Sequence, residues 1–265
     1  IDSLSGDADW YDTVIPLALF NLRYTFAESG RQVYFGTPPQ LSGPPGLSLG
    51  IVQPFSDGSR LDLSVFTRLF SEVWRDPYLT NTGRKETREY NYGTRLAYEE
   101  ILGTGFKLSY AFSRVDVNVD DIGDRFNDLE RDGYIHKAEV EYDFRLGPGI
   151  SLTPGFELSI GDIDGEANAY TGYQFGLGLR KFSKTYQIML KAGFGWDDYD
   201  DQHPVFSKTR NDTNYSVFGM FTRSDLFGID FLFGTLMAGY RYRDSNIGFL
   251  DAQTFLSGAM IGVEF

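Results

Sequence analysis

Apolar and polar side chains alternate at every second position along most of this 265-residue chain. In FKLSYAFS (residues 106–113), Phe, Leu or Tyr occupies each even position and a polar or small residue each odd one. A period of two places successive side chains on opposite faces of a strand. No stretch has the 3.6-residue period of an amphipathic helix. The alternation predicts an all-β protein whose sheet has one apolar face and one polar face.

The connections between these segments alternate in length. Short connections fall at residues 56–59, 102–105, 147–149, 183–184 and 227–228, and longer polar ones at 74–87, 117–133, 161–167, 198–213 and 242–251. Tight turns at one end and long loops at the other predict antiparallel up-and-down hairpins. The segments are about 10–15 residues long, whereas strands of globular proteins have about 5–6 residues and tilted membrane strands about 9–11.

These lengths favour a transmembrane β-barrel over a soluble sandwich or a soluble barrel. In hydrocarbon every backbone polar group must be paired, so a sheet must close on itself. The face carrying Tyr, Phe, Leu and Val would contact lipid, and the other face would line the interior. Aromatic residues near strand ends are typical of interfacial girdles, and we assign Tyr90, Tyr92, Tyr186, Trp196 and Tyr215 to them.

The strand count leaves two alternatives. Eleven strands are counted back from the C-terminus to residues 47–55, and two more segments precede them at 13–27 and 31–36. Thirteen strands would be odd for a bacterial barrel. We therefore expect an initial strand upstream of Ile1 and fourteen strands in all, within one domain over residues 1–265. The alternative merges the two early segments and gives twelve.

Composition excludes several classes of protein. No 18-residue apolar stretch is present, so a membrane helix is excluded. There is no cysteine, which argues against a disulfide scaffold or a thiolate metal site. The net charge of −13 disfavours nucleic-acid binding. The opening residues IDSL are not a signal peptide, as expected for a secreted protein numbered after processing.

Five blocks of sequence resemble a known family. They are FNLRYTFAESGRQVYFG, FSEVWRDPYLTN, LAYEEILGTGFKLSYAFS, VFSKTRNDTNYSVFG and RDSNIGFLDAQ, which together span nearly the whole chain. They resemble a family of Gram-negative outer-membrane proteins known as domain of unknown function 2860. The resemblance implies a barrel in the cell outer membrane and transfers no catalytic residue. The alternating C-terminal strand that ends in Phe also resembles the assembly signal of outer-membrane proteins.

The polar face carries many charged residues that parity places inside the barrel. They are Arg23, Asp62, Arg68, Arg95, Glu99, Lys107, Lys137, Glu139, Glu141, Asp143, Glu157, Arg180, Lys191, Arg241 and Arg243. Such side chains would set the ion preference of a water-filled lumen. Alternatively, opposite charges on adjacent strands pair and only brace the wall. Many inward glycines favour an open lumen.

Two acidic loops are weak candidates for cation sites. Asp116, Asn118 and Asp120 have the spacing that opens a calcium loop, but the later glycine and glutamate positions do not fit. For WDDYDD (residues 196–201), only the acidic composition favours a cation site. We expect solvated loops, no metal and no cofactor. The loop that begins Arg75-Asp76-Pro77-Tyr78 could fold inward as a constriction or cover the rim.

Catalysis is not indicated by the sequence. The two histidines are His136, on the apolar face, and His203, in a loop; Ser113 is the nearest nucleophile candidate for His136. No Ser-His motif is recognisable, so we expect no enzyme.

The prediction is a monomeric outer-membrane barrel that acts as a passive, porin-like channel. Its partners would be the lipid bilayer, lipopolysaccharide and small hydrophilic solutes, and not nucleic acid. The alternatives are a narrow or plugged barrel with a structural or binding role, which could sheathe a partner, and an outer-membrane hydrolase.

Overall fold

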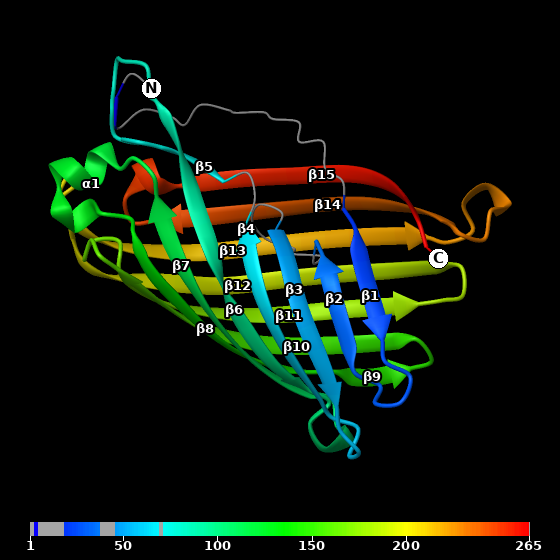
Figure 1. Cartoon of the computed structure of the whole chain (residues 1–265). Helices are drawn as coiled ribbons and strands as arrows, with labels where there is room; N and C mark the ends of the chain where they lie inside the picture. The colour runs from blue at the N-terminus through cyan, green and yellow to red at the C-terminus, as the bar shows by residue number, and fades with distance from the viewer. Residues whose placement is uncertain (1–2, 5–18, 38–45, 69–70, 265) are drawn as a thin grey trace.

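The chain forms a single curved antiparallel sheet (Figure 1), seen in a computed structural model that describes residues 3–4, 19–37, 46–68 and 71–264. The sheet has 15 strands, and its main path runs β1-β2-β3-β4-β6-β7-β8-β10-β11-β12-β13-β14-β15. The short strands β5 and β9 pair with β6 and β10. The predicted all-β, up-and-down antiparallel architecture is confirmed.

The strands lengthen toward the C-terminal half, where several exceed 12 residues. Their bounds are β1 Asn21–Thr25, β2 Gln32–Gly36, β3 Gly46–Pro54, β4 Arg60–Arg68, β5 Glu72–Trp74, β6 Glu86–Glu99, β7 Phe106–Val117, β8 Gly133–Tyr142, β9 Phe144–Gly147, β10 Ile150–Ile163, β11 Tyr170–Phe182, β12 Tyr186–His203, β13 Lys208–Arg223, β14 Leu232–Ser245 and β15 Ala252–Val263.

The two ends of the sheet differ, as most of the connection lengths predicted (Figure 1). The long connection expected at 198–213 is an exception, because β12 extends to His203 and β13 begins at Lys208, which leaves a turn at 204–207. One end, here called the loop end, carries α1 (Asp121–Arg125), η2 (Asn127–Leu129) and η4 (Gly248–Leu250). The other, the turn end, carries hairpins that include η1 (Ile101–Gly103) and η3 (Leu226–Gly228). The sheet curls so that β1–β4 lie in front of β10–β13 in this view.

The early segments form two separate strands. Strand β1 pairs with β2 in antiparallel register, and the turn between them is closed by the Phe26 amide donating to the Arg31 carbonyl at 2.8 Å. The twelve-strand alternative, which merged the two segments, is therefore wrong. Part of the predicted strand 13–27 lies outside the described residues, and the strand upstream of Ile1 stays a prediction. Within the described part, β1 pairs only with β2, and β15 only with β14.

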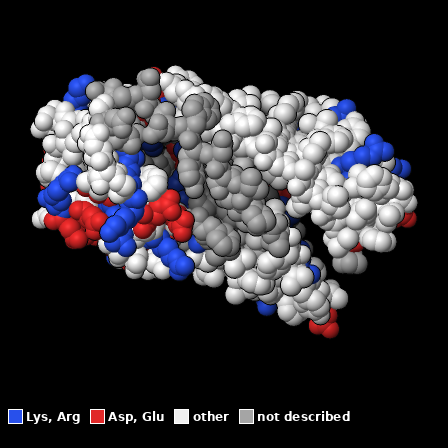
Figure 2. All heavy atoms as spheres, turned by 90° about the horizontal axis from the view of Figure 1, so that it is seen from above, with Lys and Arg blue, Asp and Glu red and all other residues white. Residues whose placement is uncertain are grey.

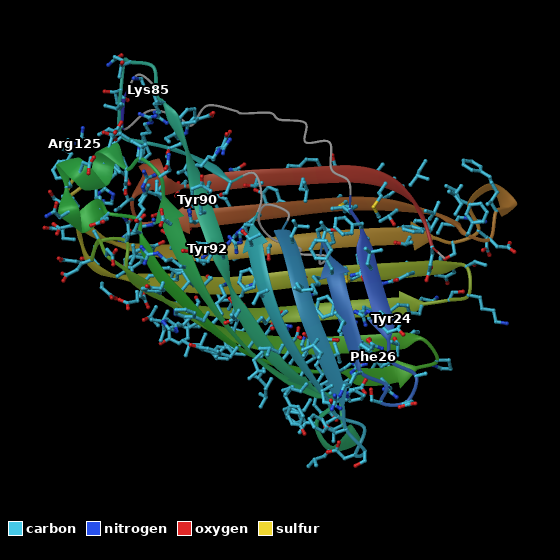
Figure 3. The ribbon with its side chains drawn as sticks, viewed as in Figure 1. Tyr24, Phe26, Lys85, Tyr90, Tyr92 and Arg125 are labelled. Atoms are coloured by element: carbon cyan, nitrogen blue, oxygen red, sulfur yellow. The ribbon has the colours of Figure 1, made fainter. Side chains whose placement is uncertain are left out.

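Large apolar side chains cover one face of the wall. Leu22, Leu96 and Leu236 are 64%, 44% and 60% exposed to solvent. Aromatic side chains mark both ends of this outer face (Figure 3): Tyr90 and Tyr92 toward the loop end of β6, and Tyr24 and Phe26 toward the turn end of β1. The opposite face carries the predicted lumen charges, and its side chains are less exposed because the concave side of a curved sheet crowds them. It is called the inner face below.

Charged side chains gather at the ends of the molecule, most densely at the loop end (Figure 2). The described atoms of the wall between the ends belong mostly to other residue types. No helix in the described part of the chain is long and apolar enough to cross a membrane.

Candidate functional site

The strand pairings place fourteen of the fifteen predicted lumen charges on the inner face. The fifteenth, Asp143, lies between β8 and β9 and accepts there from the inward-facing Thr153. The register runs, for example, from Glu99 to Lys107 and from Lys107 to Glu141, so these three residues stand side by side on three strands. Further along, Ser216 on β13 is paired with Arg241 on β14. The inner face therefore carries a connected set of charges rather than isolated ones.

Several of these charges form ion pairs between adjacent strands. The Lys107 ammonium lies 2.7 Å from a Glu141 carboxylate oxygen and 4.0 Å from Glu99, and Lys137 lies 2.7 Å from Glu157. These side chains are 16–40% exposed, so solvent screens them and each pair contributes only about 0–1 kcal/mol. Their contribution is mainly to hold charge at fixed positions on the wall.

Other acidic members are held by neutral donors. The hydroxyls of Ser109 and Thr153 donate to Glu139 at 3.0 Å and to Asp143 at 2.7 Å. The Tyr34 hydroxyl, which sequence reasoning did not identify, donates to Asp62 at 2.9 Å. These carboxylates are thus held in place on the wall by hydroxyl donors.

Some inner-face cations form no ion pair or hydrogen bond with another described residue. Arg180, Lys191 and Arg241 are of this kind, on β11, β12 and β14. Lys191 and Arg180 act electrostatically on Glu141, three and two strands away along the sheet, and Arg241 acts on Asp197. Opposite charges on the inner face thus act on one another over two or three strands as well as pairing between adjacent strands.

One row of the sheet combines charge with open space. The pairings connect Glu141 through Gly155, Gly176, Gly193 and Ser216 to Arg241. A Cβ added at Gly176 would meet nothing within 4 Å. Nearby, the inward side chain of Gln174 is exposed. At Gly155 and Gly193 an added Cβ would instead meet the side chains of Glu141 and Ser216, so the open space of this row lies at Gly176, between the acidic and the basic side chain.

The long connections pack together into a compact cluster, here called the loop cap. It consists of Tyr78, Ile122, Phe126, Leu129, Ala167, His203, Val205, Phe206 and Phe249. Ile122 and Leu129 are 1% exposed and Ala167 is fully buried. The Tyr78 ring lies 5.0–5.7 Å from the rings of His203, Phe206 and Phe249. The loop that begins at Arg75 therefore contributes to the cap.

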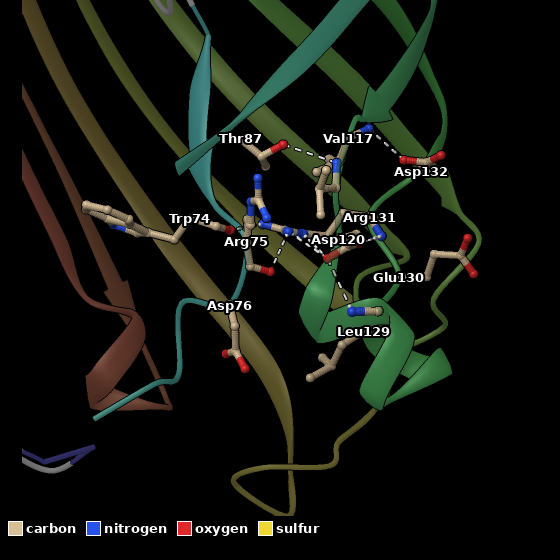
Figure 4. A network of polar contacts seen from close by, with 12 residues as sticks. Trp74, Arg75, Asp76, Thr87, Val117, Asp120, Leu129, Glu130, Arg131 and Asp132 are labelled. Atoms are coloured by element: carbon tan, nitrogen blue, oxygen red, sulfur yellow. Dashed lines mark hydrogen bonds and ion pairs between the residues drawn. The ribbon is translucent and has the colours of Figure 1, made fainter. Parts of the chain in front are cut away.

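Arg131 fastens two loops of the cap to each other (Figure 4). Its guanidinium donates to the backbone carbonyls of Trp74 at 2.8 Å and Arg75 at 3.1 Å, and also to Asp120 at 2.6 Å. Asp120 in turn accepts from the Gly123 amide at the start of α1. Arg131 thus connects its own loop to Trp74 and Arg75, which lie 57 and 56 positions earlier in the sequence.

Beneath the cap lies a buried ion pair that the sequence analysis missed. Arg210 donates through Nε to Asp212 at 2.9 Å and covers the Tyr199 ring at 4.2 Å. Arg243, a predicted lumen residue, lies 3.7 Å from the same carboxylate. The Asp212 side chain has no exposed surface, so two guanidiniums compensate its burial.

Burial shifts the proton equilibria of two cap residues. Desolvation raises the pKa of Tyr78 to about 12. Burial, followed by the charge of Arg210, lowers the pKa of His203 to about 4. The His203 Nε2 lies 2.8 Å from the Tyr78 hydroxyl, and its Nδ1 accepts from the Val205 amide at 3.3 Å. His203 is therefore neutral at pH 7 and holds two loops together.

The suggested calcium positions are otherwise engaged. Asp120 accepts hydrogen bonds from Arg131 and Gly123, and Asp116 lies 3.8 Å from Arg114. In the described residues no three His, Cys, Asp or Glu side chains come together as a metal site.

Ser113 and His136 do not form a catalytic pair. In the β7–β8 register His136 is opposite Phe112, and Ser113 is opposite Ile135. Neighbours along a strand point to opposite faces, so the serine is on the inner face and the histidine on the outer face. There His136 hydrogen-bonds the Tyr110 hydroxyl through Nδ1 at 2.7 Å.

Comparison with known proteins identifies the family. The family model described as protein of unknown function (DUF2860) matches residues 1–265, so the chain belongs to that family, as its sequence blocks indicated. No curated protein matches the sequence. Among solved structures, LpxR from Salmonella typhimurium is similar, with 14% identity and a TM-score of 0.47; the match covers 83% of this chain and 88% of LpxR.

This comparison corrects one expectation. We expected no enzyme because no Ser-His motif is recognisable in the sequence. The similarity to LpxR contradicts that expectation, and the exclusion of enzymes does not stand. The likeness is one of chain path, and it assigns neither a reaction nor a catalytic residue to this chain.

Proposed function

We propose that this member of the DUF2860 family is an outer-membrane β-barrel through which small hydrophilic solutes diffuse passively. In this proposal one copy of the chain spans the bilayer, with acyl chains against its outer face and lipopolysaccharide around its loop end. The solutes pass along the inner face, where the fixed charges set their selectivity.

The row from Glu141 to Arg241 is the observation that carries the proposal. Glu141 and Arg241 are separated by four strands, which contribute three glycines and a serine to the row. Strands lie about 4.8 Å apart, so five spacings place the two backbones about 24 Å apart along the wall. Because the middle of this row consists mostly of glycines, few side chains project from the wall there, while opposite charges stand at its two sides. Such a wall accommodates hydrated polar solutes. Bracing alone does not require unfilled space between the charges.

Single-channel recording in planar bilayers tests the proposal. The wild-type protein should give stepwise currents, and the reversal potential in a KCl gradient should report its ion preference. Lys191→Glu with Arg241→Glu should shift that preference toward cations, because two fixed positive charges become negative. Lys184→Glu at the turn end is the matched control and should leave the preference near the wild-type value.

A second variant tests the open space directly. Gly176→Phe adds an aromatic side chain where a Cβ meets nothing within 4 Å, so the conductance should fall while the fold is retained. Wild-type protein that inserts into the bilayer yet passes no current would rule out the channel.

The loop cap favours a second candidate function, a plugged barrel with a structural or binding role. Its core residues Ile122, Leu129 and Ala167 are at most 1% exposed, which is tighter packing than solvated loops require. Under this alternative the wild-type protein is silent in bilayers, and Arg131→Met, which loosens the cap, produces current. A channel that conducts equally with and without Arg131 would argue against the plug.

A further inference from the structure

All four methionines of the chain lie on the inner face of four consecutive strands. They are Met189 on β12, Met220 on β13, Met237 on β14 and Met260 on β15. Met189 is paired with Met220, and Met220 with Met237, while Met260 is opposite Thr235, two residues from Met237. The sequence period alone could not reveal this arrangement, because it depends on the register between strands.

The methionines belong to a larger apolar band. In the adjacent row toward the loop end, Phe218 is paired with Gly239, and Gly239 with Leu256. Leu256 is 51% exposed although it points inward. Phe218 and Met237 lie over glycines of the next strand, 3.0 Å and 3.3 Å from where the Cβ atoms of Gly239 and Gly258 would be. The glycines thus let these side chains lie flat against the wall.

Positive charge borders this band on the side toward the loop end. Arg241 lies two residues from Gly239 on β14, and Lys191 is paired with Phe218. Arg241 is exposed, and neither cation forms an ion pair or hydrogen bond with another described residue. The Lys191 stem extends over Gly178 of β11, where its Cγ is 3.9 Å from the Cβ position. Within this band Leu256 is exposed, the three methionines Met220, Met237 and Met260 are half-buried, and Phe218 is buried. Two available cations border this partly open apolar strip, Lys191 beside Phe218 and Arg241 toward the loop end.

We propose that this strip, defined by Phe218, Met220, Met237, Leu256 and Met260 with Lys191 and Arg241, binds a single-chain carboxylate amphiphile. The carboxylate is held by Arg241 and Lys191, and the acyl tail lies along the methionines toward the turn end. Guanidinium and ammonium groups are strong donors to carboxylates. Methionine side chains are flexible and polarisable, and they adapt to an apolar chain of irregular shape.

The dimensions of the strip agree with such a tail. From Gly239 to Phe233 on β14, six residues at about 3.4 Å each give roughly 20 Å. Phe233 is paired with Gly262 and ends the strip near the turn end. Neutral apolar ligands would leave the two cations unused, and small anions would leave the apolar band exposed. The site does not require that the barrel conducts.

Cysteine protection tests the site, because the native chain contains no cysteine. Leu256→Cys in lipid nanodiscs is labelled with a small neutral maleimide, with laurate as the probe. At laurate concentrations tenfold above its Kd, about one-eleventh of the protein is free, so labelling should slow about tenfold. Met260→Cys provides a second labelling position should Leu256→Cys fail to fold.

Matched controls separate the head from the tail. Adding Arg241→Gln and Lys191→Gln should move protection to at least about tenfold higher laurate, because hydrogen bonds between charged groups are lost. Dodecanol, which has the same tail and no charge, should protect weakly. Thr185→Cys at the turn end should label at one rate with or without laurate.

Two outcomes would overturn the proposal. One is no protection by laurate at either cysteine, and the other is equal protection by laurate and dodecanol that is unchanged when Arg241 and Lys191 are replaced. Both are independent of conductance. A silent protein that laurate protects would refute the channel and support the site, whereas a conducting protein without protection would do the reverse.

Discussion

Individual charged residues in this protein differ most in how deeply they are buried. The inner-face pair Lys107–Glu141 is partly exposed, at 29% and 16%, and its loss would change stability little. Arg131 is also partly exposed, at 20%, but it donates to two carbonyls and a carboxylate in the cap. Removing one partner of such a network leaves the others without donors.

We expect Arg131→Met to loosen the loop cap without unfolding the sheet. The Trp74 and Arg75 carbonyls lose their donor, and Asp120 loses its counter-ion, at a cost of about 2–3 kcal/mol in the local opening free energy. Hydrogen exchange followed by mass spectrometry should show faster exchange in the two loops around Arg75 and Asp120.

Arg125→Met is the matched control for this experiment. Arg125 also pairs with an aspartate of the cap, Asp76, at 3.0 Å, but its side chain is 46% exposed. Asp76 is only 4% exposed but still accepts from the Tyr78 amide, so loss of Arg125 should speed exchange less than loss of Arg131, which removes the donor to two carbonyls and a carboxylate. Equal effects from the two variants would show that Arg131 does not fasten the cap.

His203 should make the cap sensitive to acid. Its pKa is lowered to about 4, below the value of about 6.5 that an unfolded histidine has. The opened cap therefore binds a proton at higher pH than the closed cap does. The contribution of His203 is complete above pH 6.5 and is lost as the pH falls toward 4. Between pH 7 and pH 5 the opening free energy should fall by about 2 kcal/mol.

His203→Asn isolates this effect. The amide oxygen replaces Nδ1 as an acceptor and the residue no longer titrates, so cap exchange should be nearly independent of pH between 7 and 5 after correction for intrinsic exchange rates. A wild-type cap whose opening free energy is constant over the same range would show that His203 does not control it.

At the scale of the strand, neighbouring residues should respond oppositely to the same substitution. On β7, Leu108 is 49% exposed on the outer face, and Ser109 faces Glu139 on the inner face. If the outer face contacts lipid, Leu108→Lys should destabilise the barrel by about 2–4 kcal/mol near the midplane. Ser109→Lys should cost much less, because its ammonium lies among carboxylates.

Guanidinium unfolding in lipid vesicles measures both variants against the wild type. Leu236→Lys, on the outer face of β14, repeats the test at a distant strand. Equal free energies for Leu108→Lys and Ser109→Lys would mean that the outer face is not in hydrocarbon.

The strands and their faces could be predicted from sequence because parity is a local property. Lys107 and Glu141 could be assigned to the inner face without knowing which strand each would pair with. Register is different, since it depends on turn geometry and on the summed pairing of both strands. The alignment of Met189 with Met220 and Met237 was therefore not predictable from the period.

The loop cap was not predictable for another reason. Tyr78 and His203 are 125 residues apart, and neither lies in a periodic segment. Their contact follows from five loops meeting at one end of the sheet, which is a property of the tertiary fold. The composition of the loops suggested solvated chains, but the few apolar residues among the charged ones, such as Ile122 and Leu129, form the core of the cap.

At the scale of the whole molecule, the outer face sets the solvent that the protein needs. Leu22, Leu236 and Ile261 are 64%, 60% and 68% exposed, and such residues recur on every long strand. Soluble monomers rarely expose contiguous apolar patches larger than a few hundred Å². A continuous apolar wall of this kind has to be covered by lipid or detergent.

We therefore expect the folded chain to exist only with an amphiphile. Protein folded in maltoside detergent should be monodisperse and rich in β-structure by circular dichroism. Diluting the detergent below its critical micelle concentration should make the protein aggregate and sediment, because the apolar outer faces of different copies then associate. Diluting into detergent buffer is the control and should leave the sedimentation profile unchanged. A folded, monodisperse chain in plain buffer would contradict both the membrane assignment of the outer face and the channel, since an interior that conducts across a bilayer requires a wall that stays in one.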